Sequence, residues 1–295
     1  MDIRHFITFK TVAKLNSFTK ASKELGYAQS SVTAHIQALE SHMDTLLFER
    51  IGKNIKLTAK GTQLLEYIYE LLNAYEKIEN LKYEEDEPQG TIRIGVPETL
   101  MLYRLDSIFK EYKKNYPKVN IILANTPSSS LVESLHKGDL DIAFVLDHKI
   151  EDKDILSYDL IKEQMCFIFP SDFKDISLDK MPKDLSIFFT ENGCSYRYIF
   201  KNYLKQNGIS SDNIMETWSI ETIKKCVKNG IGMSFLPRIT VYEEEKNKEI
   251  KTLPCNSNHK ELISQIAYHK KKYLSPALKT FVDLTLKDSK SWLKF

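Results

Sequence analysis

The chain has 295 residues, of which 42% are hydrophobic and 28% charged, and its formal net charge is +2. This length suffices for two or three domains with cores of their own, and the composition is ordinary for a soluble globular protein. No segment approaches the roughly 20 apolar residues that cross a bilayer, and the polar amino terminus lacks the apolar core of a signal peptide. We therefore expect a cytoplasmic protein.

The charge is unevenly distributed along the chain. Residues 1–60 carry nine Lys and Arg against five Asp and Glu, a net charge of +4. Residues 61–90 carry two Lys against eight Asp and Glu, a net charge of −6. A basic head followed by an acidic segment indicates that any polyanionic partner binds at the head.

The sequence lacks the motifs of several enzyme and metal-site classes. The four cysteines form no C-x-x-C pair and have no His at zinc-finger spacing, which favours free thiols and no bound metal or cofactor. There is no H-E-x-x-H, no G-x-S-x-G and no P-loop. The loose acid–base candidates Glu133, His136 and Asp141 show no nucleophile–base spacing, so the sequence does not favour an enzyme.

Three helices and a hairpin are predicted at the amino terminus. The helix over residues 3–14 has an apolar face made of Ile3, Phe6, Ile7, Val12 and Ala13. Ser17 is suited to the N-cap of a helix over 18–25, and Gly26 to the turn that ends it. A third helix over 29–40 directs Val32, Ile36 and Leu39 inward. Residues 50–57 alternate around Gly-Lys-Asn, as expected of a hairpin.

A long helix is predicted to follow, from about residue 59 to 86, with Thr58 as its cap. Apolar residues at heptad spacing form one seam along it, namely Leu64, Ile68, Leu71, Tyr75 and Ile78. We expect this seam to pair with a second chain; the alternative is that it packs against its own head. The segment Pro88-Gln89-Gly90 then indicates a linker.

From residue 91 the pattern changes to alternating strands and helices. Strands are predicted at 91–96, 119–123 and 141–145, with helices at 98–115 and 128–137 between them, which indicates a parallel sheet. A second half repeats this logic, with strands at 165–169, 185–189, 214–217 and 233–236, helices at 196–206 and 220–229, and a closing helix at 275–287.

The most specific motif lies in the head. Ser17-Phe18-Thr19-Lys20-Ala21-Ser22-Lys23-Glu24-Leu25 is followed by Gly26-Tyr27-Ala28-Gln29-Ser30-Ser31-Val32-Thr33. Ala21 is small where two crossing helices approach closely, Gly26 supplies the turn, and Leu25, Val32 and Ile36 fill a small core. This spacing is typical of a helix-turn-helix.

At these residues the sequence resembles the LysR-type regulators. The resemblance continues through Leu39-Glu40, Leu47-Phe48-Glu49-Arg50, Leu57-Thr58-Ala59-Lys60-Gly61, Gly138-Asp139-Leu140-Asp141-Ile142-Ala143 and the segment 227–237. The one departure is Ala21-Ser22, where the family often has two alanines.

The resemblance implies an architecture of three parts. An all-α winged helix-turn-helix DNA-binding domain would span 1–58, a linker and dimerisation helix 59–89, and an α/β effector-binding domain 90–295. The last would resemble periplasmic solute-binding proteins, with one lobe at 90–161 and 267–295 and the other at 162–266.

The resemblance also implies partners. These are double-stranded DNA carrying an interrupted inverted repeat rich in A and T, a small-molecule effector, and further copies of the chain in a homodimer and homotetramer. Effector binding would rotate the lobes and change how paired heads sit on DNA. The alternative is a small-molecule binding protein without a transcriptional role.

Candidate DNA contacts lie on the helix over 29–40, on the helix before it and on the hairpin. Gln29 suits adenine, the hydroxyl groups suit phosphates, and the basic hairpin residues neutralise phosphates or enter the minor groove. His35 is either a phosphate contact or a bystander. The full set is Ser17, Thr19, Gln29, Ser30, Ser31, Thr33, His35, Arg50, Lys53 and Lys56.

Candidate effector contacts lie where strands end and helices begin in the two lobes. Helix N-termini and Arg197 favour an anion, whereas Glu98 suits an ammonium, so the sequence predicts an anion or a zwitterion. Cys194 is either a redox thiol or an ordinary lining residue. The full set is Pro97, Glu98, Thr99, Thr126, Ser128, Ser129, Asn192, Cys194, Arg197 and Trp218.

Overall fold

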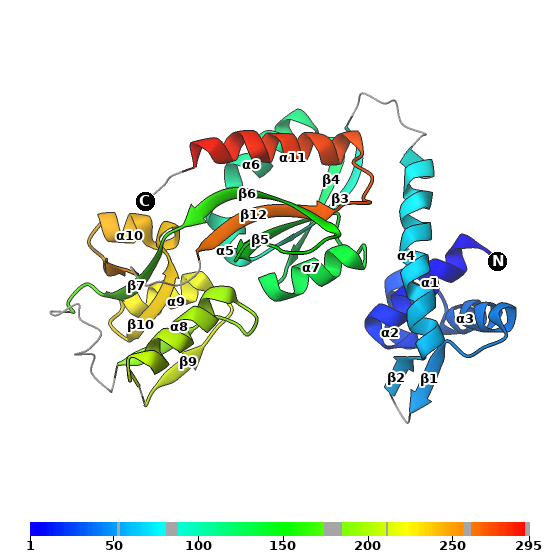
Figure 1. Cartoon of the computed structure of the whole chain (residues 1–295), viewed down its shortest axis with the longest axis horizontal. Coiled ribbons are helices and arrows are strands. Elements are labelled where there is room, and N and C mark those ends of the chain that lie inside the picture. Colours follow the sequence, from blue (N-terminus) through cyan, green and yellow to red (C-terminus); the bar gives the residue numbers. More distant parts are fainter. Residues whose placement is uncertain (52–53, 81–87, 174–184, 211, 256–260, 293–295) are drawn as a thin grey trace. The chain divides into compact units, whose positions relative to one another are not determined.

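The structure is a computed structural model that describes residues 1–51, 54–80, 88–173, 185–210, 212–255 and 261–292 (Figure 1). The chain divides into two compact units, Met1–Glu84 and Glu85–Phe295.

The amino-terminal unit has the elements of a winged helix-turn-helix. Three short helices are followed by an antiparallel hairpin and one long helix. The elements are α1 (Ile3–Leu15), α2 (Phe18–Leu25), α3 (Gln29–Met43), β1 (Phe48–Ile51), β2 (Asn54–Leu57) and α4 (Ala59–Asn80). The predicted order is confirmed, and α3 extends three residues beyond its predicted end at residue 40.

One small apolar core holds this unit together. Its buried members are Phe9, Val12, Phe18, Ala21, Val32, Ile36, Leu39, Leu47, Phe48 and Ile68. Of the predicted face of α1, Val12 is buried in this core and Phe6 and Ala13 pack against it, whereas Ile3 and Ile7 are not part of it; Phe9, which was not predicted, is buried there. Local signals set the helix ends as expected. The Ser17 hydroxyl accepts the N–H of Lys20 at 3.2 Å, and Gly26 ends α2 with a φ of 67°, which favours glycine.

The predicted seam of α4 is divided between two environments. Ile68 is buried in the core of its own unit and Leu64 packs against that core, whereas Leu71, Tyr75 and Ile78 are exposed. The prediction that the whole seam pairs with a partner chain is therefore wrong for Leu64 and Ile68. The helix begins as predicted, since the Thr58 hydroxyl accepts the N–H of Gly61 at 2.9 Å. Residues 81–86 of the predicted helix lie outside the described residues.

The carboxyl-terminal unit contains two five-stranded sheets, each with its own helices. The first lobe is built on the strand order β4-β3-β5-β12-β6. Its elements are β3 (Gly90–Val96), α5 (Glu98–Tyr103), α6 (Asp106–Asn115), β4 (Val119–Asn125), α7 (Ser128–His136), β5 (Ile142–Asp147), β6 (Ile155–Glu163), β12 (Leu262–His269), α11 (Pro276–Asp288) and the 3-10 turn η3 (Ser289–Ser291). The strands β4, β3 and β5 are parallel, as predicted; β12 is antiparallel to β5, and β6 is antiparallel to β12.

The alternation of side chains along β5 builds the layers of this lobe. Phe144 belongs to the core that contains Phe281 of α11, whereas Val145 belongs to a second core with Leu131 and Leu135 of α7. Because successive side chains of a strand point to opposite faces, α11 and α7 cover opposite faces of the sheet (Figure 1).

The second lobe is built on the strand order β11-β7-β10-β8-β9. Its elements are β7 (Met165–Pro170), β8 (Ser186–Phe189), α8 (Ser195–Gln206), β9 (Ile214–Glu216), α9 (Ile220–Lys228), β10 (Gly232–Pro237), η2 (Arg238–Val241), α10 (Tyr242–Lys246) and β11 (Ile250–Pro254). The βα units of the second half are thus present as predicted, and β8 is parallel to both of its neighbours.

Three expectations for this unit need correction. The predicted lobe boundaries at 161/162 and 266/267 fall inside β6 and β12, which both belong to the first lobe. The strands β6, β11 and β12 were not predicted. The predicted helix 98–115 is two helices, because Arg104 leaves the helical conformation with a φ of −125°. Its guanidinium forms a buried ion pair with Glu163 on β6 at 2.7 Å.

Candidate functional site

The first turn of α3 presents a polar surface. Val32 and Ile36 are buried in the core, whereas Gln29 and Ser30 are exposed. Ala28 at the N-cap position supplies no side-chain hydrogen bond, so the first-turn N–H groups remain available to an external acceptor. This is the end of a helix at which an anion binds favourably.

The start of α2 lies beside the start of α3. The Thr19 hydroxyl donates to the side-chain oxygen of Gln29 at 3.2 Å, and the Thr33 hydroxyl donates to the backbone oxygen of Gln29 at 3.0 Å. The predicted contacts of the two helices therefore form one surface. Ser17 lies at its edge, where its hydroxyl already caps α2.

His35 joins α3 to α1. Its Nδ1 lies 2.9 Å from the Thr8 hydroxyl, and its ring centroid is 4.9 Å from that of His5 and 5.6 Å from that of Tyr27. Burial lowers the pKa of His35 from its ordinary value. These contacts give His35 a packing role, and not the free position of a bystander.

The hairpin is tied to α3 at its base. The Glu40 carboxylate accepts the N–H groups of Leu47 and Phe48 at 2.8 and 3.3 Å. Lys56 is exposed on β2. Lys53 and the side chain of Arg50 lie outside the described residues.

A small pocket lies between the two lobes of the carboxyl-terminal unit. About 310 Å³ of space, open solvent included, lies among the residues that line it. Six predicted effector contacts line it, namely Pro97, Glu98, Thr99, Ser128, Cys194 and Trp218. Leu146, Glu191, Tyr196 and Ile220 also line it and were not predicted individually. Three of these four lie close to predicted contacts: Glu191 precedes Asn192, Tyr196 precedes Arg197, and Ile220 follows Trp218 by two residues.

Hydrogen bonds cross from lobe to lobe at this pocket. The Thr99 hydroxyl on α5 lies 3.0 Å from the phenolic oxygen of Tyr196 on α8. The Glu98 carboxylate on α5 accepts the N–H of Ile220, the first residue of α9, at 2.9 Å. The hydroxyl of Ser128 lies against both backbone polar groups of Leu146 within its own lobe.

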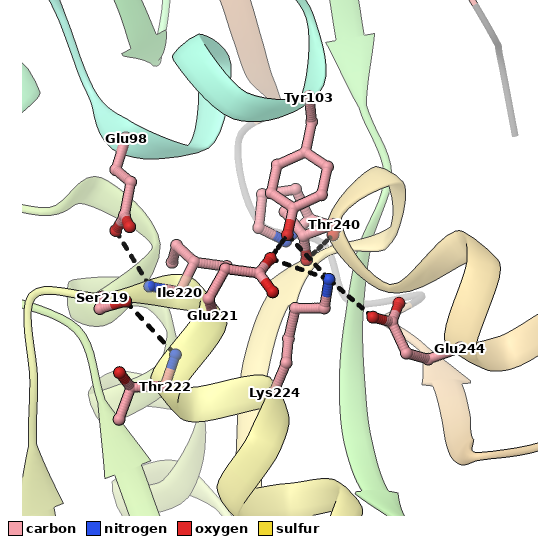
Figure 2. A network of polar contacts seen from close by, with 10 residues as sticks. Glu98, Tyr103, Ser219, Ile220, Glu221, Thr222, Lys224, Thr240 and Glu244 are labelled. Atoms are coloured by element: carbon pink, nitrogen blue, oxygen red, sulfur yellow. Dashed lines mark hydrogen bonds and ion pairs between the residues drawn. The ribbon is translucent and has the colours of Figure 1, made fainter.

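A second set of interlobe contacts lies at the other end of α5 (Figure 2). Lys224 on α9 is buried, and its ammonium pairs with Glu221 at 3.0 Å and with Glu244 of α10 at 2.8 Å. It also donates to the hydroxyl of Tyr103 at 2.8 Å, and that hydroxyl donates to Glu221. We call Tyr103, Glu221, Lys224 and Glu244 the interlobe network. One short helix thus carries pocket residues at its start and a network residue at its end.

Comparison with known proteins identifies the family. The family model described as "LysR substrate binding domain" matches residues 85–289, and that described as "Bacterial regulatory helix-turn-helix protein, lysR family" matches residues 3–62. The chain belongs to the LysR family of transcriptional regulators. A relative from Bacillus subtilis (strain 168), the uncharacterized HTH-type transcriptional regulator YwqM, is 37% identical over 98% of this chain and 100% of its own length.

Solved structures share the LysR fold over nearly the whole chain. A full-length OxyR variant from Pseudomonas aeruginosa has a TM-score of 0.67 at 17% identity and covers 99% of this chain and 95% of its own. Full-length CbnR complexed with its target DNA has a TM-score of 0.60 at 19% identity and covers 98% of this chain and 100% of its own. Among the helices of the described residues, none combines the length and apolar character that crossing a membrane requires.

Four predicted effector contacts of this LysR protein do not line the pocket. Arg197 is buried within the second lobe, where its guanidinium donates to the backbone oxygen of Thr190 and pairs with Glu216. The expected role of Arg197 as an effector contact is therefore wrong: it is an ion pair of its own lobe. The other three residues outside the lining are Thr126, Ser129 and Asn192.

The charged groups that line the pocket are both carboxylates. Within the described residues, Glu98 and Glu191 line it and no Lys, Arg or His does. Burial raises the pKa of Glu191, and the negative charge of Glu98 adds to this effect. Burial also raises the pKa of the Cys194 thiol to about 11, so this residue lines the pocket as a protonated thiol.

The loose acid–base candidates are dispersed among separate ion pairs. Asp141 pairs with Lys272 at 2.7 Å, Glu133 pairs with Lys137, and His136 lies 2.9 Å from Asp152. Nothing in these pairs brings a nucleophile to a base.

Proposed function

We propose that this chain binds promoter DNA through its amino-terminal unit and that a small molecule in the interlobe pocket controls this binding. The observation that carries the proposal is the first turn of α3, which is uncapped and exposes Gln29 and Ser30 beside Thr19. DNA is a cytoplasmic partner, so we place the protein in the cytoplasm.

The chemistry of the α3 surface suits a DNA major groove. The amide of Gln29 can pair with adenine through two hydrogen bonds, and the hydroxyls of Ser30, Ser31 and Thr33 suit phosphate oxygens beside a helix N-terminus. Ser17 and Thr19 extend this surface to the start of α2. Arg50, Lys53 and Lys56 complete the proposed set at the hairpin, where cations neutralise phosphates and displace counterions.

The exposed part of α4 suits pairing of two chains. Leu71, Tyr75 and Ile78 are exposed apolar residues at heptad spacing, and each has at least 38% of its surface open to solvent. Such a stripe is stable in water when a second helix covers it. We propose a dimer through this stripe and a tetramer of two such dimers. Two heads related by symmetry would then read an interrupted inverted repeat rich in A and T.

A ligand in the pocket can change how the two lobes, and with them the subunits, are arranged. Its walls come from both lobes, and Glu98 and Thr99 already bind across it. A ligand that favours one lobe orientation over another shifts the population of that orientation by its difference in affinity. We propose that this shift changes the spacing of paired heads and so the affinity for the promoter.

The substitution Gln29→Ala tests the DNA-binding surface. Loss of a bidentate base contact costs about 1–3 kcal/mol, or roughly tenfold to a hundredfold in affinity. Binding to the chain's own upstream region, measured by fluorescence anisotropy, is expected to weaken by this factor at unchanged salt dependence. Gln63→Ala removes an exposed amide from α4 and is the control. Equal affinities of the two variants would contradict the proposed surface.

A further inference from the structure

The pocket is electrostatically one-sided. Both charged residues that line it in the described structure, Glu98 and Glu191, are acidic, and they come from opposite lobes. The nearby guanidinium of Arg197 is held by the backbone oxygen of Thr190 and the carboxylate of Glu216. Among the described lining residues, an anionic ligand would therefore meet two carboxylates and no side-chain cation, since Arg197 lies outside the lining.

The two carboxylates have different tasks. Glu98 accepts the N–H of Ile220 at 2.9 Å, so part of its charge is stabilised within the protein. Glu191 is half-buried. The nearby charge of Arg197 favours its ionised form, but burial and the charge of Glu98 outweigh this and raise its pKa. An ionised carboxylate in a partly enclosed site is costly unless a cation accompanies it. The ligand can supply that cation.

The remaining lining suits an organic cation of small size. Trp218 has 64% of its surface exposed while it lines the pocket, so its ring is open to a ligand ammonium, which aromatic faces attract. Leu146 and Ile220 offer apolar contact to a carbon skeleton. A calcium ion needs six to eight oxygen ligands, and no group of three or more candidate metal ligands occurs in the described residues.

We propose that the effector carries a protonated amine, which Glu191 binds as its main charged partner while Glu98 and Trp218 complete the site. This inference rests on the proposed function of the pocket as the effector site. The sequence predicted an anion or a zwitterion as the effector. An effector with a protonated amine excludes the simple anion and leaves amines and amine-bearing zwitterions.

Calorimetry on the full-length protein tests the charge preference. The probes are primary alkylamines, with alcohols and carboxylates of matched chain length. We expect the amines to bind and the matched alcohols and carboxylates to bind at least about tenfold more weakly, since a charge-assisted contact is worth that factor or more. Equal or tighter binding of the carboxylates, or no binding of any amine, would overturn the proposal.

Glu191→Gln gives the matched variant, with Glu151→Gln as its control because Glu151 is exposed and lies outside the pocket. Glu191→Gln is expected to weaken amine binding about tenfold, and the control to leave it unchanged. Without ligand, Glu191→Gln is expected to raise the melting temperature at neutral pH, because it removes a carboxyl group whose charged form burial disfavours. A lower melting temperature would show that the carboxylate already has a stabilising partner, and would overturn the proposal.

The experiments test the amine preference of the pocket separately from effector control of promoter binding. If carboxylates bind in the pocket and change promoter affinity, the amine inference fails and effector control stands. If amines bind with the expected dependence on Glu191 but promoter affinity never changes, the amine inference stands and effector control fails.

Discussion

Removal of one hydroxyl from the interlobe network is expected to loosen the two lobes. In Tyr103→Phe the ring that lies 4.9 Å from the Lys224 ammonium remains, while the hydroxyl that bridges Lys224 and Glu221 is lost. Burial and the Glu221 contact raise the pKa of Tyr103, so this hydroxyl stays protonated and can donate over the whole usable pH range.

The size of the effect follows from what remains of the network. A hydrogen bond to a charged group contributes about 1.5–3 kcal/mol to stability. Because 45% of the Glu221 side chain is exposed, water replaces part of the hydrogen bond that Tyr103 no longer donates. Lys224 also keeps both carboxylate partners. We therefore expect Tyr103→Phe to lower the free energy of lobe separation by about 1–1.5 kcal/mol, which shifts the equilibrium roughly fivefold to tenfold toward separated lobes.

Hydrogen exchange of the full-length protein measures this shift. The amide of Ile220 donates to Glu98 across the lobes, so its exchange should quicken about fivefold to tenfold when the lobes separate more often. Tyr198→Phe removes the hydroxyl of a tyrosine that is 69% exposed on α8 and is the control. Equal exchange at Ile220 in the two variants would refute the assignment of the network as an interlobe contact.

Three further predictions concern stability. Arg104→Met leaves the carboxylate of Glu163, whose side chain is 1% exposed, buried without its cation. Urea titration should therefore show a free energy of unfolding that is lower by about 3–5 kcal/mol; a decrease under about 1 kcal/mol would contradict this prediction. Burial lowers the pKa of His35, so its contribution to stability is full above the ordinary value of 6.5 and is lost as pH falls below it; the melting temperature of His35→Gln should fall less than that of the native chain between neutral and acidic pH. Ser17→Ala removes the cap on Lys20 N–H and should cost about 1 kcal/mol in urea titration; an unchanged midpoint would exclude a capping role.

The local parts of the fold could be predicted because their signals lie within a few residues. Ser17 and Gly26 set both ends of α2, and Val32 and Ile36 at helical spacing set the inner face of α3. Alternation along β5 places side chains in two cores, as its apolar run predicts for a strand buried on both faces.

The failures share a non-local cause. Arg104 breaks the predicted helix because its buried partner, Glu163, lies on a strand of the same lobe 59 residues later. Arg197 was expected in the pocket because its guanidinium suits an anion, but its partner Glu216 lies 19 residues further along the chain. Ile68 matched a heptad seam and instead fills the core of its own unit.

The same limit applies to the candidate site. Glu191 directly precedes Asn192, which was predicted to contact the effector, yet no local pattern separates Glu191 from its neighbours. Its importance depends on Glu98, which the fold brings to the same pocket from the other lobe. Where two acidic residues meet across a cleft is decided by tertiary structure, so the sequence could predict the loops and not the sign of the charge.

Promoter binding by the paired heads is decided by titrating the full-length protein against its own upstream region at rising salt. We expect an oligomer that retains this DNA, and we expect the logarithm of its affinity to fall linearly with the logarithm of salt concentration, because bound phosphates release counterions. A monomer, or a protein whose retention of this DNA does not respond to salt, would contradict it.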